Sequence, residues 1–114
     1  MGHMKTTSRI RELNNLCRTA MGVAGRLVQT EGINALSAAD QSAIREKVER
    51  FDAFTPDNDP HLEADFGSFE HNRQTIFWKI DYFQKGSNLT AGAETPEDAT
   101  ATDRVLTIML AEEY

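Results

Sequence analysis

The chain has 114 residues, a formal net charge of −6 and a single cysteine. This length fits one domain with one modest core, and the sequence has no apolar run of the ~20 residues that a membrane span needs. One cysteine cannot form an internal disulfide, so we expect a cytoplasmic protein that does not contact membranes.

The charge is distributed unevenly along the chain. Residues 1–50 carry 8 Lys/Arg and 5 Asp/Glu, whereas residues 51–114 carry 4 and 13, so the net charges of the two parts are +3 and −9. Binding to DNA or RNA requires Lys and Arg at the phosphates. We therefore expect no direct contact with nucleic acid, and we expect a protein partner with a basic surface instead.

The first part of the chain predicts a helix, a strand and a second helix. We treat residues 1–7 as an expression scar and a flexible N-terminus, and residues 8–114 as a single α+β domain. Apolar residues at helical spacing predict a helix over residues 9–21, with Met21 in its apolar stripe and Gly22 as its stop. A short strand follows over residues 26–30.

The residues of its first turn predict where the second helix begins. Ser37, with Asp40 three residues later, predicts an N-cap, and the apolar stripe of the helix then passes through Ile44, Val48 and Phe51. This stripe predicts the face that packs against the sheet.

A β-hairpin is predicted over residues 66–71 and 74–83, around a two-residue turn at Asn72 and Arg73. In its second strand, alternation places one group of apolar side chains on one face (Ile76, Trp78, Ile80, Tyr82) and a second group on the other (Phe77, Phe83, with Lys79 and Asp81 between them). Aromatic residues on both faces favour a central strand.

The last predicted element is a helix that begins at Thr95 and Pro96 and runs to the C-terminus. The β-branched residues Val105, Thr107 and Ile108 leave a terminal strand as the alternative. The predicted fold is thus α+β, in the order α-β-α-β-β-α, with an antiparallel, hairpin-containing sheet packed against helices.

The stretch FTPDNDPHLEADFGSFE, residues 54–70, has a polar residue at every second position (Asp57, Asp59, His61, Glu63, Asp65). An extended backbone would place these side chains on one side, as a surface for a divalent cation or a basic partner. The stretch lacks the glycine and the glutamate of a calcium-binding EF-hand loop, since Leu62 and Ser68 stand at those positions. The alternative is a polar loop whose aspartates form turn hydrogen bonds.

No spacing in the sequence specifies an active site. His61 and His71 are candidate bases, but neither lies in a recognisable catalytic motif, and the glycine motifs that bind phosphates are absent. We therefore expect no cofactor and favour a protein that is not an enzyme.

Over residues 8–114 the chain resembles a small bacterial family of unknown function. Four short sequence motifs carry the resemblance: FDAFTPDNDP, DFGSFE, FWKIDYF and RVLTIMLAEEY. Members of that family are often carried on plasmids and other mobile elements. Relatives often have a histidine before the DFG word, where this chain has Ala64. The resemblance implies a role on mobile elements and supplies no catalytic residue.

Our leading hypothesis is a small acidic interaction module that inhibits a host defence nuclease of the restriction or CRISPR type. Its carboxylates would take the place of phosphates on the basic surface of the nuclease (Asp57, Asp59, Glu63, Asp65, Glu70, Asp81). One alternative is a divalent-metal-dependent hydrolase that uses the Asp/His/Glu residues of the segment 57–65. Another is a homodimeric scaffold that pairs through exposed aromatic residues.

Overall fold

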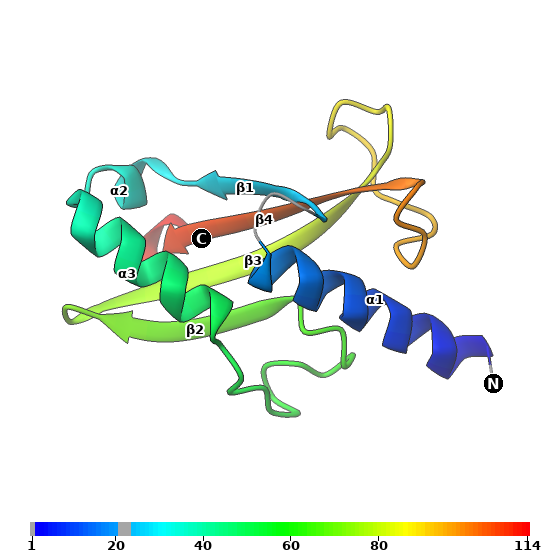
Figure 1. Cartoon of the computed structure of the whole chain (residues 1–114), viewed down its shortest axis with the longest axis horizontal. Coiled ribbons are helices and arrows are strands. Elements are labelled where there is room, and N and C mark those ends of the chain that lie inside the picture. Colours follow the sequence, from blue (N-terminus) through cyan, green and yellow to red (C-terminus); the bar gives the residue numbers. More distant parts are fainter. Residues whose placement is uncertain (1, 21–23) are drawn as a thin grey trace.

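The computed structural model describes residues 2–20 and 24–114. It is a small α+β domain whose helices lie on one face of a four-stranded sheet (Figure 1). The elements in chain order are α1 (Gly2–Thr19), β1 (Arg26–Gln29), α2 (Glu31–Asn34), α3 (Ala38–Glu49), β2 (Phe66–His71), β3 (Gln74–Gln84), β4 (Thr102–Leu110) and the 3₁₀ helix η1 (Ala111–Glu113). No helix in these ranges is long and apolar enough to cross a bilayer.

The sheet has the strand order β1-β4-β3-β2. The pairs β2–β3 and β3–β4 are antiparallel, whereas β1 runs parallel to β4, with Arg26 beside Val105. The sheet is therefore mixed, which corrects the prediction of an antiparallel sheet. The prediction of β3 as a central strand is confirmed.

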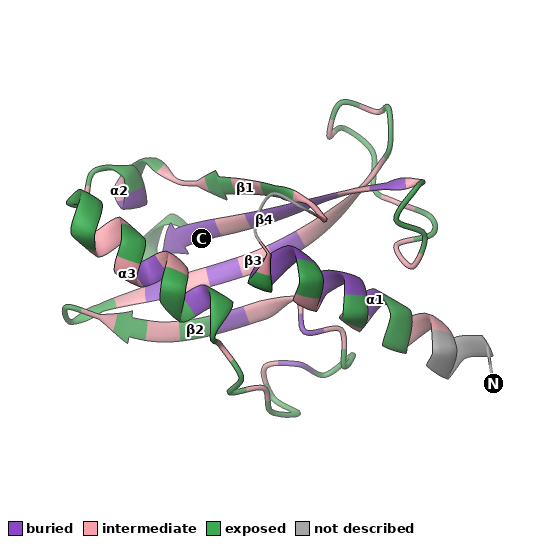
Figure 2. Ribbon diagram, viewed as in Figure 1, coloured by how far each residue is buried: buried purple, intermediate pink, exposed green. Residues whose placement is uncertain are grey.

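The predicted C-terminal helix is wrong, because residues 102–110 form β4. This strand lies between β1 and β3 and is buried along most of its length (Figure 2). A buried strand with a neighbouring strand on each edge favours β-branched residues, which explains Val105 and Ile108. The cap-like Thr95 and Pro96 lie in the loop between β3 and β4.

Two other predictions that depend on local signals, the N-cap at Ser37 and the hairpin turn at Asn72 and Arg73, are confirmed. The hydroxyl of Ser37 accepts a hydrogen bond from the backbone N–H of Asp40 at 3.1 Å, and α3 begins at the next residue, Ala38. Asn72 and Arg73 have φ angles of 49° and 66°, as a two-residue hairpin turn requires. The helix α1 begins at Gly2, earlier than expected, while Met21 and Gly22 lie outside the described residues.

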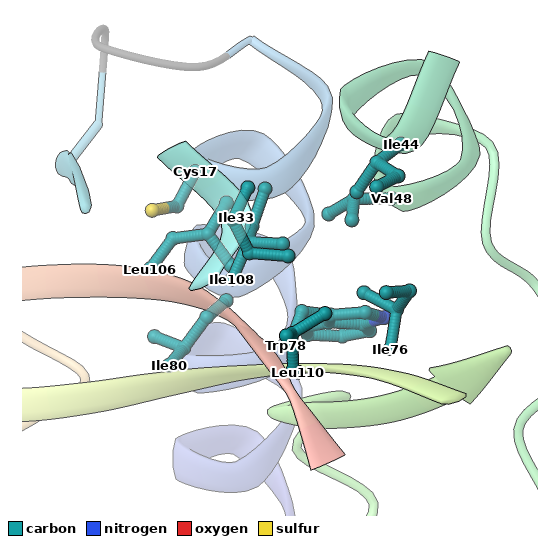
Figure 3. Packing of buried hydrophobic residues seen from close by; sticks show 10 residues of the cluster. All are labelled: Cys17, Ile33, Ile44, Val48, Ile76, Trp78, Ile80, Leu106, Ile108 and Leu110. Carbon is teal, nitrogen blue, oxygen red and sulfur yellow. The ribbon is translucent and has the colours of Figure 1, made fainter. Parts of the chain in front are cut away.

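The core lies between the sheet and the helices. Among the described residues, ten buried ones form it, and Trp78 at its centre is fully buried (Figure 3). The indole meets the rings of Phe51 and Phe54 edge to face, with centroids 5.5 and 6.1 Å away. On the neighbouring strand, Gly67 leaves the space into which the indole fits, since a Cβ there would overlap the indole Nε1.

Replacing Gly67 by alanine tests this contact. We expect Gly67→Ala to lower the free energy of unfolding by about 1–3 kcal/mol, because the methyl group overlaps a rigid ring in a filled core. Urea unfolding measures the change. The matched control is Gly92→Ala, where no atom lies within 4 Å of the added methyl group, and equal effects of the two substitutions would contradict the assignment.

Candidate functional site

The acidic segment, which we define as residues 52–65, connects α3 to β2 beside α1 (Figure 1). The segment and α1 form the walls of a cavity of about 670 Å³ that is open to solvent. The residues that line it include Arg11, Phe54, Pro56, Asp59, His61 and Leu62. The cavity thus combines apolar side chains with Arg11 of α1 and two carboxylates of the segment, Asp59 and Glu63.

The segment is not extended, so its alternate residues do not share one side. Leu62 and Ala64 have φ angles of 60° and 54°, which turn the backbone. Asp59 points inward and is 2% exposed. Its Oδ2 lies 2.7 Å from Nη1 of Arg11, and its Oδ1 accepts a hydrogen bond from the N–H of Ala64 at 3.0 Å. Asp59 therefore holds the loop to α1.

Glu63 is also used inside the molecule. The hydroxyl of Tyr82 donates to Oε1 of Glu63 at 2.6 Å and accepts a hydrogen bond from the side chain of Asn14 at 2.7 Å. Asn14 is fully buried, and its Oδ1 accepts from Nε of Arg104 at 2.9 Å. Burial, and then the hydrogen bond to Glu63, raise the pKa of Tyr82, so this phenol remains a hydrogen-bond donor.

Asp57 and Asp65 are the other two acidic residues of the segment that the sequence predicted to contact a partner. Asp57 is exposed, and among the described residues neither side chain forms an ion pair. Partial burial raises the pKa of Asp65 above its ordinary value, and the nearby charges of Glu63 and Asp59 raise it further. Asp65 therefore lies half-buried and near two other carboxylates of the segment, Glu63 and Asp59.

Glu70 and Asp81 lie on the other face of the sheet. Glu70 accepts a hydrogen bond from the hydroxyl of Thr75 at 2.6 Å, and Asp81 pairs with Lys79 at 3.1 Å. The six residues predicted as one docking surface thus fall into two groups, because alternation along β2 and β3 points these two side chains away from the helices.

The residues that the alternative metal site would have used do not converge. Among the described residues, no three His, Cys, Asp or Glu side chains lie close enough together to hold an ion. His61 is exposed and lines the cavity. His71 has a structural role, since its Nδ1 accepts from Lys47 at 3.0 Å and its Nε2 donates to Asp40 at 2.9 Å. This contact holds the end of β2 against the start of α3.

Sequence reasoning missed the polar residues that α1 and β4 turn inward. Arg18 is 5% exposed, donates to the carbonyl oxygens of Val48 and Glu49, and places its guanidinium group over the rings of Phe54 and Trp78 at 5.6 and 5.5 Å. A signal for this was available, because Asn14 and Arg18 follow Leu13 and Cys17 directly and so extend the apolar stripe of α1 on one side.

A family model described as "Protein of unknown function (DUF3768)" matches residues 29–113. The chain belongs to this family. The match extends from the end of β1 to the end of η1 and includes the acidic segment and the hairpin, while α1 precedes it. The resemblance to a family of unknown function is therefore confirmed. No curated protein and no solved structure matches the chain.

The ion pair of Asp59 should stabilise the domain. We expect Asp59→Asn to lower the free energy of unfolding by about 1.5–3 kcal/mol, because the amide cannot replace a buried carboxylate that accepts from both Arg11 and Ala64. The control is Asp57→Asn, an exposed change that should stay within about 0.5 kcal/mol. Thermal unfolding of both variants at pH 7 makes the comparison, and a neutral Asp59→Asn would contradict the role of this contact.

The pKa of Asp65 predicts a dependence of stability on pH. Because its pKa is raised above 3.8 in the folded state, the ionised form costs folding free energy once the pH rises above that value. We expect Asp65→Asn to stabilise the domain at pH 7 and to have almost no effect near about pH 3, where the aspartate is protonated. Urea unfolding at the two pH values measures this.

The control for Asp65 is Asp98, whose pKa is lowered by hydrogen bonds from Thr100. Its ionised form favours folding, so Asp98→Asn should destabilise the domain at pH 7 and lose its effect as the pH falls. The same sign for both variants at pH 7 would contradict the assigned causes.

Proposed function

We propose that this chain is a protein-interaction module that docks its acidic segment on a basic surface of a partner protein. One observation supports the proposal most directly. The segment has five carboxylates and no Lys or Arg, and among the ion pairs of the described residues one of the five, Asp59, pairs with an arginine, Arg11. Counting that arginine, five negative charges and one positive charge leave the segment at −4.

The residues that would contact the partner are a subset of those expected from the sequence. Asp57 and Asp65 keep that role, and Asp52, which is exposed and has no ion pair among the described residues, joins them. Asp59 and Glu63 instead give the segment its shape. Their neighbours bind them inside the domain, so the segment that carries the three other carboxylates is held against α1 and β3.

The cavity beside the segment adds an apolar component to this surface. Leu62 is 62% exposed, although it is a large apolar residue, and it lies with Phe54 and Pro56 along the cavity wall. An apolar side chain of the partner fits such a cavity, while Lys or Arg residues on either side of it would meet the carboxylates. The partner chemistry that we propose is an apolar anchor flanked by basic residues.

The chemistry of this surface also points to a class of partner. A protein surface that binds nucleic acid is basic and apolar in the same way, since it contacts phosphates and stacked bases. A module that occupies such a surface blocks it without any catalysis. We propose a nucleic-acid-binding effector of a bacterial defence system as the target, with the carboxylates in the place of phosphates.

Charge reversal tests the docking surface. We expect Asp52→Lys with Asp57→Lys to weaken partner binding at least about tenfold, because two attractive contacts become repulsive. Partners are captured on the tagged chain from a bacterial lysate that contains restriction and CRISPR effectors, identified by mass spectrometry, and their affinities measured with purified proteins.

The control for charge reversal is Glu31→Lys with Glu94→Lys. Both glutamates are exposed and lie outside the acidic segment, and the pair changes the net charge by the same amount. If both double variants lost the same affinity for the partner, net charge alone would explain the loss, and the docking surface would be rejected. Restriction of phage and plasmid DNA that proceeds unchanged in cells expressing the chain would reject the defence target.

A further inference from the structure

In the part of the chain that the structure describes, no helix or further strand lies over the face of the sheet that points away from the helices (Figure 1). Alternation places side chains from all four strands there, among them Val28 of β1, Phe77 of β3 and Phe66 of β2. The rings of Phe66, Phe77 and Tyr114 pack edge to face at one end of it. The loop after β3 stays beside the sheet, since Gly92 pairs with Phe83 as a further strand would.

A stripe of four side chains runs along the middle of this face. We define it as the β3 stripe, and its members in order are Phe77, Lys79, Asp81 and Phe83. Both phenylalanines are partly exposed, and the side chains of Lys79 and Asp81 are 39% and 40% exposed. When a second β3 stripe runs antiparallel to the first, each phenylalanine faces the other phenylalanine of the second stripe, and the lysine faces the aspartate.

We infer that a second copy of this chain covers this face in a dimer with twofold symmetry. An axis that passes over Ile80, midway between the two facing sheets, perpendicular to β3 and parallel to the sheet, brings Lys79 opposite Asp81 of the second copy. The same axis brings Phe77 opposite Phe83 of the second copy. A twofold interface must be complementary to itself, and the β3 stripe has that property in both its charges and its aromatic rings.

The charges of Lys79 and Asp81 also favour one direction of the twofold axis, and they favour a second copy of this chain over a basic partner. An axis parallel to β3 would place Lys79 opposite Lys79 and Asp81 opposite Asp81, which is repulsive. The β3 stripe has one cation and one anion, so it offers no net attraction to a strongly basic partner. It therefore differs from the acidic segment, and the dimer does not depend on the proposed function.

The size of the face sets the expected strength of the dimer. The face is four strands wide and its longest strand has 11 residues, so its projected area is below roughly 700 Å². Stable complexes bury about 800 Å² on each partner. We therefore expect a dimer that dissociates on dilution, and we expect the mass measured by sedimentation to rise with concentration from 12.8 kDa toward twice that value.

Charge exchange at the β3 stripe tests the dimer. In Lys79→Asp, two aspartates of one copy face two aspartates of the other, and in Asp81→Lys, two lysines face two lysines. Both variants should stay monomeric in sedimentation velocity experiments at concentrations where the original chain dimerises. Circular dichroism checks that each variant is folded.

Two further measurements separate the twofold arrangement from a general loss of association. The double variant K79D/D81K restores opposite charges across the axis and should dimerise again. An equimolar mixture of the two single variants should form a heterodimer, because two aspartates then face two lysines. A chain that remains at 12.8 kDa up to about 500 µM, where Kd values in the micromolar range give dimers, would overturn the inference. A double variant or a mixture that stays monomeric would overturn it as well.

Discussion

The packing of the Trp78 indole determines where the acidic segment lies. Gly67 on the neighbouring strand admits the ring, and Phe54, the third residue of the segment, meets its edge. Arg18 of α1 covers both rings with its guanidinium group. One aromatic side chain of the sheet thus joins a strand, a helix and a loop, and the carboxylates that follow Phe54 take their positions from this packing rather than from their own alternation.

The features that were predictable from the sequence depend on neighbouring residues. The N-cap at Ser37 and the hairpin turn at Asn72 each need only a few adjacent positions, so local patterns identify them. The features that were missed depend on distant residues. Residues 102–110 form a strand because β1 and β3 lie on either side, and Asp59 is buried because Arg11, on another element, pairs with it. Alternation of polar residues cannot reveal such a partner.

The two surfaces that we propose lie on opposite sides of the sheet. The acidic segment is beside α1 on the helical side, whereas the β3 stripe lies on the side without helices. A dimer formed through the stripes would leave both acidic segments accessible and pointing outward. Two docking sites in one particle bind a partner with two equivalent sites much more tightly than one does, so weak self-association would raise the effective affinity of a modest docking surface.

The parallel pairing of β1 with β4 has a consequence for the order of folding. It places residue 26 beside residue 105, so the sheet closes only when most of the chain is available. During synthesis on the ribosome, the hairpin of β2 and β3 can form early, since its contacts are local. The first strand has no place to bind until residues 102–110 have emerged, and the apolar side chains of α1 remain exposed to chaperones and proteases for that time.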